Sequence, residues 1–173
     1  MILNKHIIIV FFLLSSSSDI FSQEYRIFQD NENDPIIVGI SARDVYQDSI
    51  YASWYNFEYT NYKLNTKLLY NNKSSFENKI IKIVLGTWCI DSKREVPRFV
   101  KILDFLEFPS DKILFINVDR EKRGLYNEVE DINIEFVPTF IVYEDGKEIG
   151  RIIESPINSL EEDLIKIVAE PTQ

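Results

Sequence analysis

The chain has 173 residues, of which 45% are apolar and 27% are charged. This composition excludes a disordered chain and fits one globular domain with an extension. The formal net charge of −9 repels phosphate backbones and anionic lipid surfaces, so nucleic acids and membrane surfaces are not expected partners.

The first 22 residues resemble a signal peptide. Residues 7–14 are apolar without interruption, which matches a signal-peptide core and is too short to cross a bilayer. A serine run follows at residues 15–18, and residues 20–22 offer a cleavage site. We therefore expect the mature chain to begin near Gln23 and to be exported, to the periplasm or as a secreted protein. The alternative is that this segment stays attached as an uncleaved membrane anchor.

Cys89 is the only cysteine and His6 the only histidine of the chain. An exported protein with one cysteine has no internal disulfide, so its thiol is either reactive or an intermolecular partner. Loss of His6 with the signal peptide would remove every histidine. This excludes Cys–His and Ser–His–Asp catalysis and most zinc sites, so we expect neither a metal nor another cofactor.

Residues 23–78 are predicted to form an N-terminal extension that packs on a core domain. Residues 23–35 are polar and acidic and are expected to be a mobile lead-in, whereas residues 36–40 form an apolar run typical of a strand. Ser41 is expected to cap a helix. That helix would present, at roughly helical spacing, Val45, Ile50, Trp54 and Phe57. Its many tyrosines indicate packing against a neighbouring core, and a second, weaker helix is expected within residues 66–76.

Residues 79–170 are predicted to form the core domain. Three apolar runs, at residues 80–85, 113–118 and 139–143, are typical of strands buried on both faces of a sheet. An amphipathic helix is expected between the first two strands, with an apolar stripe of Val96, Phe99, Val100, Leu103 and Leu106. A short helix is expected at residues 125–129.

The core domain is expected to end in a hairpin and a helix. Asp145-Gly146 is a turn signal, with the returning strand at residues 147–153. Ser159 and Glu162 form a capping box before a helix. The apolar face of that helix consists of Leu160, Leu164, Ile167 and Val168. This order of strands and helices predicts an α/β fold with a central mixed sheet, flanked by helices and covered on both faces.

Cys89 lies where the first buried strand leads into the amphipathic helix. A cysteine at a helix N-terminus faces unpaired backbone N–H groups and the positive end of the helix dipole. Both favour the thiolate, which is the nucleophilic form of the side chain. Ser92, one turn further on, is expected to donate a hydrogen bond to the sulfur. The charged residues at 93–94 and 161–163 are interpreted as solvated helix faces.

The motifs around Cys89 resemble those of the thioredoxin family. That family carries Trp-Cys at the start of this helix, a proline within the helix and a cis-proline loop before the third strand. The matching positions here are Trp88, Cys89, Pro97 and Val137-Pro138-Thr139. The resemblance implies a thioredoxin fold and a cis bond before Pro138, in a loop that lies beside Cys89 and offers backbone groups to an extended peptide. The substrate-binding residues it implies are Trp88, Val137, Pro138 and Thr139.

Two positions depart from the family pattern. Ser92 stands where the family has its second, resolving cysteine, and Ile83 stands where redox thioredoxins place a buried acid. The dithiol cycle is therefore not available within this chain, but Cys89 could still form a mixed disulfide with a substrate. More narrowly, residues 86–99 are similar to a subgroup of exported bacterial thioredoxin-like proteins, which also has a helical extension before the core.

The leading hypothesis is a monothiol thiol–disulfide exchange protein, with Cys89 as nucleophile and Ser92 as hydrogen-bond donor. Its partners would be a protein or peptide that bears a thiol or a disulfide, and an external reductant. The alternative is a non-redox module that binds peptides or proteins, in which Cys89 is incidental. A homodimer linked through Cys89 is a third possibility.

Overall fold

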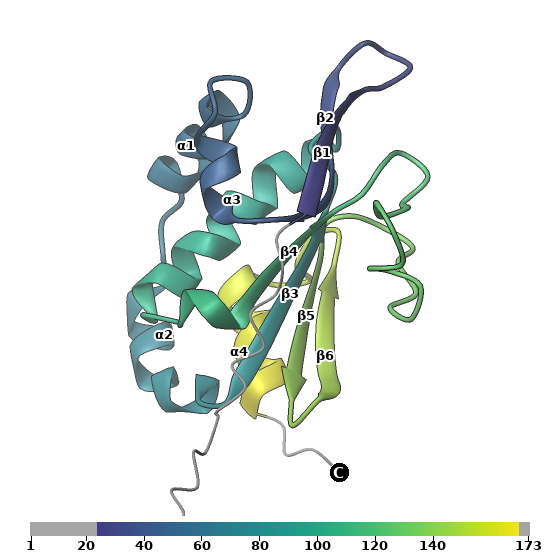
Figure 1. Cartoon of the computed structure of the whole chain (residues 1–173). Helices are drawn as coiled ribbons and strands as arrows, with labels where there is room; N and C mark the ends of the chain where they lie inside the picture. The colour runs from purple at the N-terminus through teal and green to yellow at the C-terminus, as the bar shows by residue number, and fades with distance from the viewer. Residues whose placement is uncertain (1–23, 170–173) are drawn as a thin grey trace, which may run out of the picture.

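The structure, a computed structural model, describes residues 24–169. The predicted signal peptide lies outside these residues. Six strands form one mixed sheet, drawn edge-on in Figure 1. In chain order they are β1 (Glu24–Gln29), β2 (Pro35–Ser41), β3 (Lys79–Leu85), β4 (Ile113–Asn117), β5 (Thr139–Glu144) and β6 (Lys147–Ile153). Their order across the sheet is β1-β2-β4-β3-β5-β6.

The described helices are few and mostly short. The α-helices are α1 (Ala52–Asn61), α2 (Thr66–Asn71), α3 (Ile90–Phe105) and α4 (Leu160–Ala169). Short 3-10 helices occur at Arg43–Gln47, Lys73–Phe76 and Ser110–Lys112. None of the helices within residues 24–169 combines the length and the apolar character that crossing a membrane requires.

Two supersecondary units make up the core. In the first, β3, α3 and β4 follow one another, and β3 and β4 are parallel because α3 carries the chain back across the sheet. In the second, β5 and β6 form a hairpin that precedes α4, and β5 pairs antiparallel with β3. This arrangement is the thioredoxin fold, so the predicted α/β fold class is confirmed.

The two faces of the sheet are covered differently. All four α-helices contribute to a core cluster on one face, where Phe99 of α3 stacks on Phe140 of β5 with ring centroids 4.1 Å apart. On the other face, Val84 of β3 belongs to a smaller cluster, which also includes Ile132 and Val137. The loop of residues 118–138 covers this second face, on the side of the sheet opposite α1 and α3 (Figure 1).

The helix expected at residues 125–129 is wrong. This part of the loop makes single turns instead, with the N–H of Glu130 bonded to Asn127 O and that of Ile132 to Val129 O. Five residues are too few to offset the cost of nucleating a helix without a continuous apolar face. The apolar residues of the loop pack on the sheet one at a time, as turns permit.

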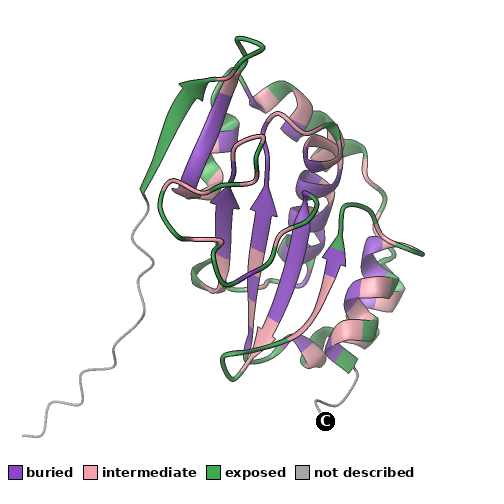
Figure 2. Cartoon of the chain, turned by 90° about the vertical axis from the view of Figure 1, so that its right-hand side faces the viewer, coloured by how far each residue is buried: buried purple, intermediate pink, exposed green. Residues whose placement is uncertain are grey.

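The extension continues the sheet beyond β4. β2 pairs antiparallel with β4, and β1 pairs with β2 along its full length, from Glu24 opposite Ile40 to Gln29 opposite Pro35. The prediction of a mobile lead-in at residues 23–35 is therefore wrong. All six residues of β1 are exposed at the edge of the sheet (Figure 2). Polar and apolar residues alternate in it only from Glu24 to Ile27, and a polar and acidic stretch follows, so the strand pattern is short.

Ser41 does not cap a helix as predicted. It is the last residue of β2, and its hydroxyl lies 2.9 Å from Asn117 Nδ2 and 3.3 Å from Tyr46 Oη. The Tyr46 hydroxyl also donates to Asn117 Oδ1 at 2.8 Å. The Ser41 side chain is thus engaged in a buried polar network with β4. α1 begins only at Ala52, without a side-chain cap.

Tyrosines fill the space between α1 and the sheet, as the sequence indicated. Tyr46, Tyr51 and Tyr55 are buried, and Tyr46 stacks on Tyr55 with centroids 5.7 Å apart. The prediction that Ile50 and Phe57 lie on the apolar face of this helix is wrong, because their side chains are 49% and 64% exposed. A turn before Ala52 breaks the helical spacing, so the residues before and after it do not share one face.

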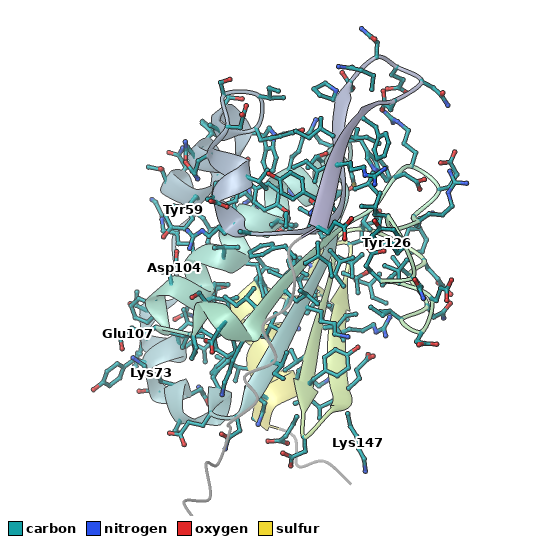
Figure 3. All side chains as sticks on the ribbon, in the orientation of Figure 1. Tyr59, Lys73, Asp104, Glu107, Tyr126 and Lys147 are labelled. Carbon is teal, nitrogen blue, oxygen red and sulfur yellow. The ribbon has the colours of Figure 1, made fainter. Side chains whose placement is uncertain are left out.

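α1 and α4 are attached to the core by polar contacts as well as apolar ones. The Tyr59 hydroxyl of α1 donates to Asp104 of α3 at 2.6 Å, and both side chains are labelled in Figure 3. At the start of α4, the Glu162 N–H donates to Ser159 Oγ at 3.1 Å, which confirms Ser159 as the cap. Glu161 is 2% exposed, so its interpretation as part of a solvated face is wrong.

Glu161 joins α4 to the segment between α1 and α2. Its Oε2 accepts from the Tyr62 hydroxyl at 2.7 Å, and its Oε1 accepts from the Asn65 N–H at 3.1 Å. Burial and the neighbouring Glu161 carboxylate both raise the pKa of Tyr62. Two hydrogen bonds to a carboxylate thus hold the extension against the last helix.

Candidate functional site

Cys89 occupies the N-cap position of α3, directly after the turn that ends β3. Its N–H donates to Gly86 O at 2.9 Å, and its carbonyl accepts the first helical hydrogen bond, from the Lys93 N–H at 3.0 Å. The residue has extended backbone angles and is half-buried. The sulfur therefore lies at the positive end of a 16-residue helix with part of its surface open to solvent.

The structure brings Cys89 and the loop before β5 together, as the resemblance implied. The Cys89 thiol donates to the Val137 carbonyl, with 3.2 Å between sulfur and oxygen. The Val137–Pro138 peptide bond is cis. Thr139 is buried, and its hydroxyl donates to Phe136 O at 2.7 Å, which braces the turn. These contacts join residues 48 positions apart in the sequence.

Ser92 lies close to the site but in a different role from the one expected. It is fully buried, and its Oγ accepts a hydrogen bond from the Gly86 N–H at 3.2 Å. Within residues 24–169 the expected hydrogen bond to the Cys89 sulfur is not formed. Ser92 therefore fastens the first turn of α3 to the end of β3, and it supports Cys89 through the backbone.

Trp88 does not project into solvent beside the cysteine. Its indole folds back over Gly86, where an added Cβ would lie 2.5 Å from the ring atom Cε2. The indole N–H donates to Val118 O at 2.9 Å. On the ring face, the Arg120 guanidinium lies 5.5 Å from the centroid. Trp88 is thus held by one backbone carbonyl, one cation and its packing against the smaller core cluster.

The charged residues of the first turns of α3 neutralise one another. Arg94 forms two ion pairs, from Nη2 to Asp91 Oδ1 at 2.6 Å and from Nε to Glu95 Oε1 at 2.5 Å. Arg98 Nη2 lies 2.6 Å from Oε2 of Glu58 in α1. The hydrogen bond to Glu95, followed by the one to Asp91, raises the pKa of Arg94 above its usual value. Arg94 and Arg98 are therefore already paired with carboxylates, so neither brings an unneutralised charge to the start of α3.

Ile83 and Pro97 lie under the site. Both are buried, Ile83 on the face of β3 that carries α3 and Pro97 inside α3. Where redox thioredoxins have a buried acid, this chain thus has an apolar side chain that packs in the core. Residues 24–169 contain no group of three or more His, Cys, Asp or Glu side chains placed to hold a metal ion.

Sequence reasoning missed Arg120 and its partner Asp30. Asp30 Oδ2 accepts from Arg120 Nε at 2.6 Å, and only 4% of the Asp30 side chain is exposed. Burial opposes the charged form, but backbone N–H groups and Arg120 outweigh it and hold the pKa of Asp30 below its usual range. No motif marks these residues, because they come from two loops that meet only in the folded chain.

The fold and the site together define a class: a thioredoxin-fold protein with a single cysteine at the N-terminus of the helix that follows the first core strand. No family model matches the chain. Over 80 residues it is 29% identical to Thioredoxin-like protein R548 of Acanthamoeba polyphaga mimivirus, which shows weak thioredoxin-like homology. The match covers 46% of this chain and 56% of the viral protein, so the chain spans little more than half of that relative.

Two solved structures are also similar. A protein of unknown function, PA1234 from Pseudomonas aeruginosa, is 15% identical with a TM-score of 0.47, over 68% of this chain and 79% of that one. Mitochondrial thioredoxin 3 from Saccharomyces cerevisiae, in its oxidized form, is 23% identical with a TM-score of 0.34, over 56% of this chain and 86% of that one.

Proposed function

We propose that the protein exchanges thiols and disulfides through Cys89 alone. The observation that carries the proposal is the position of the sulfur: half-buried, at the N-cap of α3, and 3.2 Å from the Val137 carbonyl. The sulfur is thus within reach of a substrate disulfide, and its thiolate is the species that attacks such a bond. The thioredoxin-like homology of the viral relative supports the same chemistry.

The reaction conserves electrons at each step. The Cys89 thiolate attacks one sulfur of a substrate disulfide, a new S–S bond forms to Cys89, and the second substrate sulfur leaves as a thiolate that takes a proton from water. Because the chain has no second cysteine, an external thiol, or another thiol of the substrate, must attack the mixed disulfide. That attack releases Cys89 as a thiolate and leaves the attacking sulfur bonded to the substrate.

The backbone hydrogen bonds of residues 137–139 limit where an extended peptide could pair with this loop. Thr139 is already paired with Val84 on one side and Ile153 on the other, so no further strand fits beside it. The Pro138 carbonyl accepts from the Glu154 N–H at 2.7 Å. Val137 is left with a carbonyl that only the thiol uses, and an N–H without a partner among residues 24–169. An extended substrate would therefore pair with Val137, beside Trp88 and Pro138.

The proposed setting is the periplasm or the medium outside the cell. It follows from the signal-peptide pattern of residues 1–22 and from the similarity of residues 86–99 to exported bacterial proteins of this class. Such a compartment is oxidising, so the disulfides of substrate proteins persist in it. Cys89 would form mixed disulfides with these substrates.

The test is the reactivity of Cys89 in the folded chain. Purified residues 23–173 would be mixed with oxidised glutathione, and the mass of one added glutathionyl group followed with time. We expect the folded chain to form this adduct without denaturant, because the sulfur is partly exposed at the start of α3. Cys89→Ser should show no adduct, and dithiothreitol should reverse the adduct of the parent.

A lack of reaction in the folded chain would contradict the proposed exchange function. If Cys89 reacts only after unfolding, the thiol is protected rather than used, and a module that binds peptides without redox chemistry becomes the better account. In that case partners captured on the folded protein should persist in the Cys89→Ser variant and under reducing conditions. Partners seen only as reducible adducts would instead support exchange.

A further inference from the structure

Trp88 packs against the smaller core cluster, and the loop that follows β4 supplies two further contacts that fix the orientation of its ring. The indole rests on Gly86, its N–H bonds Val118 O, and the guanidinium of Arg120 faces the ring. Val118 and Arg120 are two positions apart on that loop, so the loop holds the indole at its edge and at its face. Arg120 therefore contributes to the position of the Trp88 indole beside Cys89.

Arg120 is in turn held by the turn between β1 and β2. Its Nε donates to Asp30 Oδ2 at 2.6 Å and its Nη2 to Glu32 Oε2 at 2.8 Å, while Asp34 lies 3.8 Å away. The other carboxylate oxygen of Asp30 accepts from the N–H groups of Glu32 and Asp34, at 2.9 and 2.8 Å. The turn is thus closed by Asp30, which leaves its second oxygen aimed at the guanidinium.

We infer that Arg120 is a positioning residue that fixes Trp88 beside Cys89, so that the β1–β2 turn shapes the surface on which a substrate peptide docks. The inference rests on the proposed exchange function for its link to substrate. It joins segments near residues 30, 88 and 120, which no sequence motif connects. It also gives the extension a task at the site, because the extension supplies all the carboxylates that hold Arg120.

The chemistry requires a guanidinium at this position. Its planar group donates in fixed directions to two carboxylates and at the same time lies against an aromatic face. A lysine would keep the charge but would offer one compact ammonium that cannot satisfy both geometries. Arg120→Lys therefore separates the positioning of Trp88 from the neutralisation of Asp30.

The experiment uses the full mature chain with Trp54→Phe, so that Trp88 is the only tryptophan. Arg120→Lys is compared with Arg123→Lys, since Arg123 lies on the same loop and pairs with Asp119 and Glu121 rather than with Trp88. We expect Arg120→Lys to raise acrylamide quenching of Trp88 about two- to fivefold, the range of an exposed cation–π contact. Arg123→Lys should leave the quenching unchanged.

Activity is measured with two probes in the same variants. With a peptide disulfide, we expect Arg120→Lys to raise the concentration for half-maximal rate about two- to fivefold while the maximal rate stays within twofold. With iodoacetamide, which needs no docking surface, the rate should not change. Glu32→Gln, which removes one exposed partner of Arg120, should give a smaller change in the same direction.

The fluorescence assay tests whether Arg120 positions Trp88, and the exchange assay tests the proposed function, so each claim can be rejected without the other. If Trp88 quenching is the same in Arg120→Lys and Arg123→Lys, the positioning role is wrong, whatever Cys89 does. A changed quenching without any change toward the peptide disulfide would overturn the link to docking. A complete absence of exchange in the parent chain would reject the proposed function, while quenching would still decide whether Arg120 holds Trp88. Guanidinium unfolding of each variant checks that the chains compared are folded.

Discussion

At position 86 only a hydrogen atom fits beneath the Trp88 indole. A Cβ there would lie 2.5 and 2.6 Å from two ring atoms, closer than real contacts allow. We expect Gly86→Ala to lower the free energy of unfolding by about 1–3 kcal/mol, because the indole must move and its bond to Val118 O is lost. Guanidinium unfolding followed by circular dichroism measures this.

A double-mutant cycle separates this clash from other effects of alanine. In a Trp88→Ala background the added methyl group meets no ring, so Gly86→Ala should cost less than about 0.5 kcal/mol. Equal costs in the two backgrounds would show that the indole does not constrain position 86.

The positions of site residues that belong to a sequence motif could be predicted from the sequence. The contacts of residues from loops that lie far apart in the sequence could not. Cys89 and Val137 were expected to lie together because the family pattern specifies both, and the structure puts them in contact. The expected bond from Ser92 to the sulfur is not formed; the Ser92 hydroxyl oxygen instead accepts from the Gly86 N–H. Arg120 carries no local signal at all, since its partners lie about 30 and 90 positions away in the chain.

At the scale of elements, Glu161 is the side chain that connects the extension to α4. We expect Glu161→Gln to lower the free energy of unfolding by about 1.5–3 kcal/mol, because hydrogen bonds from Tyr62 and Asn65 lose their charged acceptor. The pKa of Tyr62 should also fall, since a neighbouring negative charge is removed. Chemical unfolding and the pH dependence of tyrosine absorbance measure the two effects.

Glu162→Gln is the matched control, one residue further along the same helix. Glu162 is exposed and takes part through its backbone N–H, which the substitution keeps. Its effect should stay within about 0.5 kcal/mol. Similar losses in the two variants would mean that the charge of the first helical turn matters, rather than the contact with the extension.

Elements with one buried face, or two, were predictable, and those without a buried face were not. β3, β4 and β5 are apolar runs because they lie in the middle of the sheet, and their predicted bounds agree with the structure to within a residue. β1 is exposed on both faces, and its alternation of polar and apolar residues spans only four positions, from Glu24 to Ile27, before a polar and acidic stretch. The loop of residues 118–138 holds isolated apolar side chains, which resemble a helix only over a short window.

At the scale of the whole molecule, buried tyrosines make the fold sensitive to alkali. Burial, the largest effect, raises the pKa of Tyr55 from 10.0 to about 12, although Arg43 opposes the shift. The folded chain thus keeps a proton that the unfolded chain loses between these values, so stability must fall as the pH rises through this window. The contribution of Tyr55 amounts to about 2–3 kcal/mol by pH 12.

Unfolding free energies at pH 9, 10, 11 and 12 measure this loss. In Tyr55→Phe the ring packing remains but the ionisable group is gone, so stability should fall less steeply between pH 10 and 12. The stability of the variant at pH 9 serves as its own baseline, because the bond from Arg43 Nε is lost at every pH. An equal slope in the parent and the variant would contradict the prediction.

The pairing of β2 with β4 has a consequence for how the chain folds as it is synthesised. Residues 39–41 bond to residues 115–117, so this edge of the sheet cannot close until residue 117 has been synthesised. Contacts of such long sequence separation raise the contact order and slow folding. Until then β1 and β2 can form only an isolated hairpin, which is marginal in water. The turn that holds Arg120 is therefore synthesised well before Arg120, and it reaches this partner only after β4 emerges.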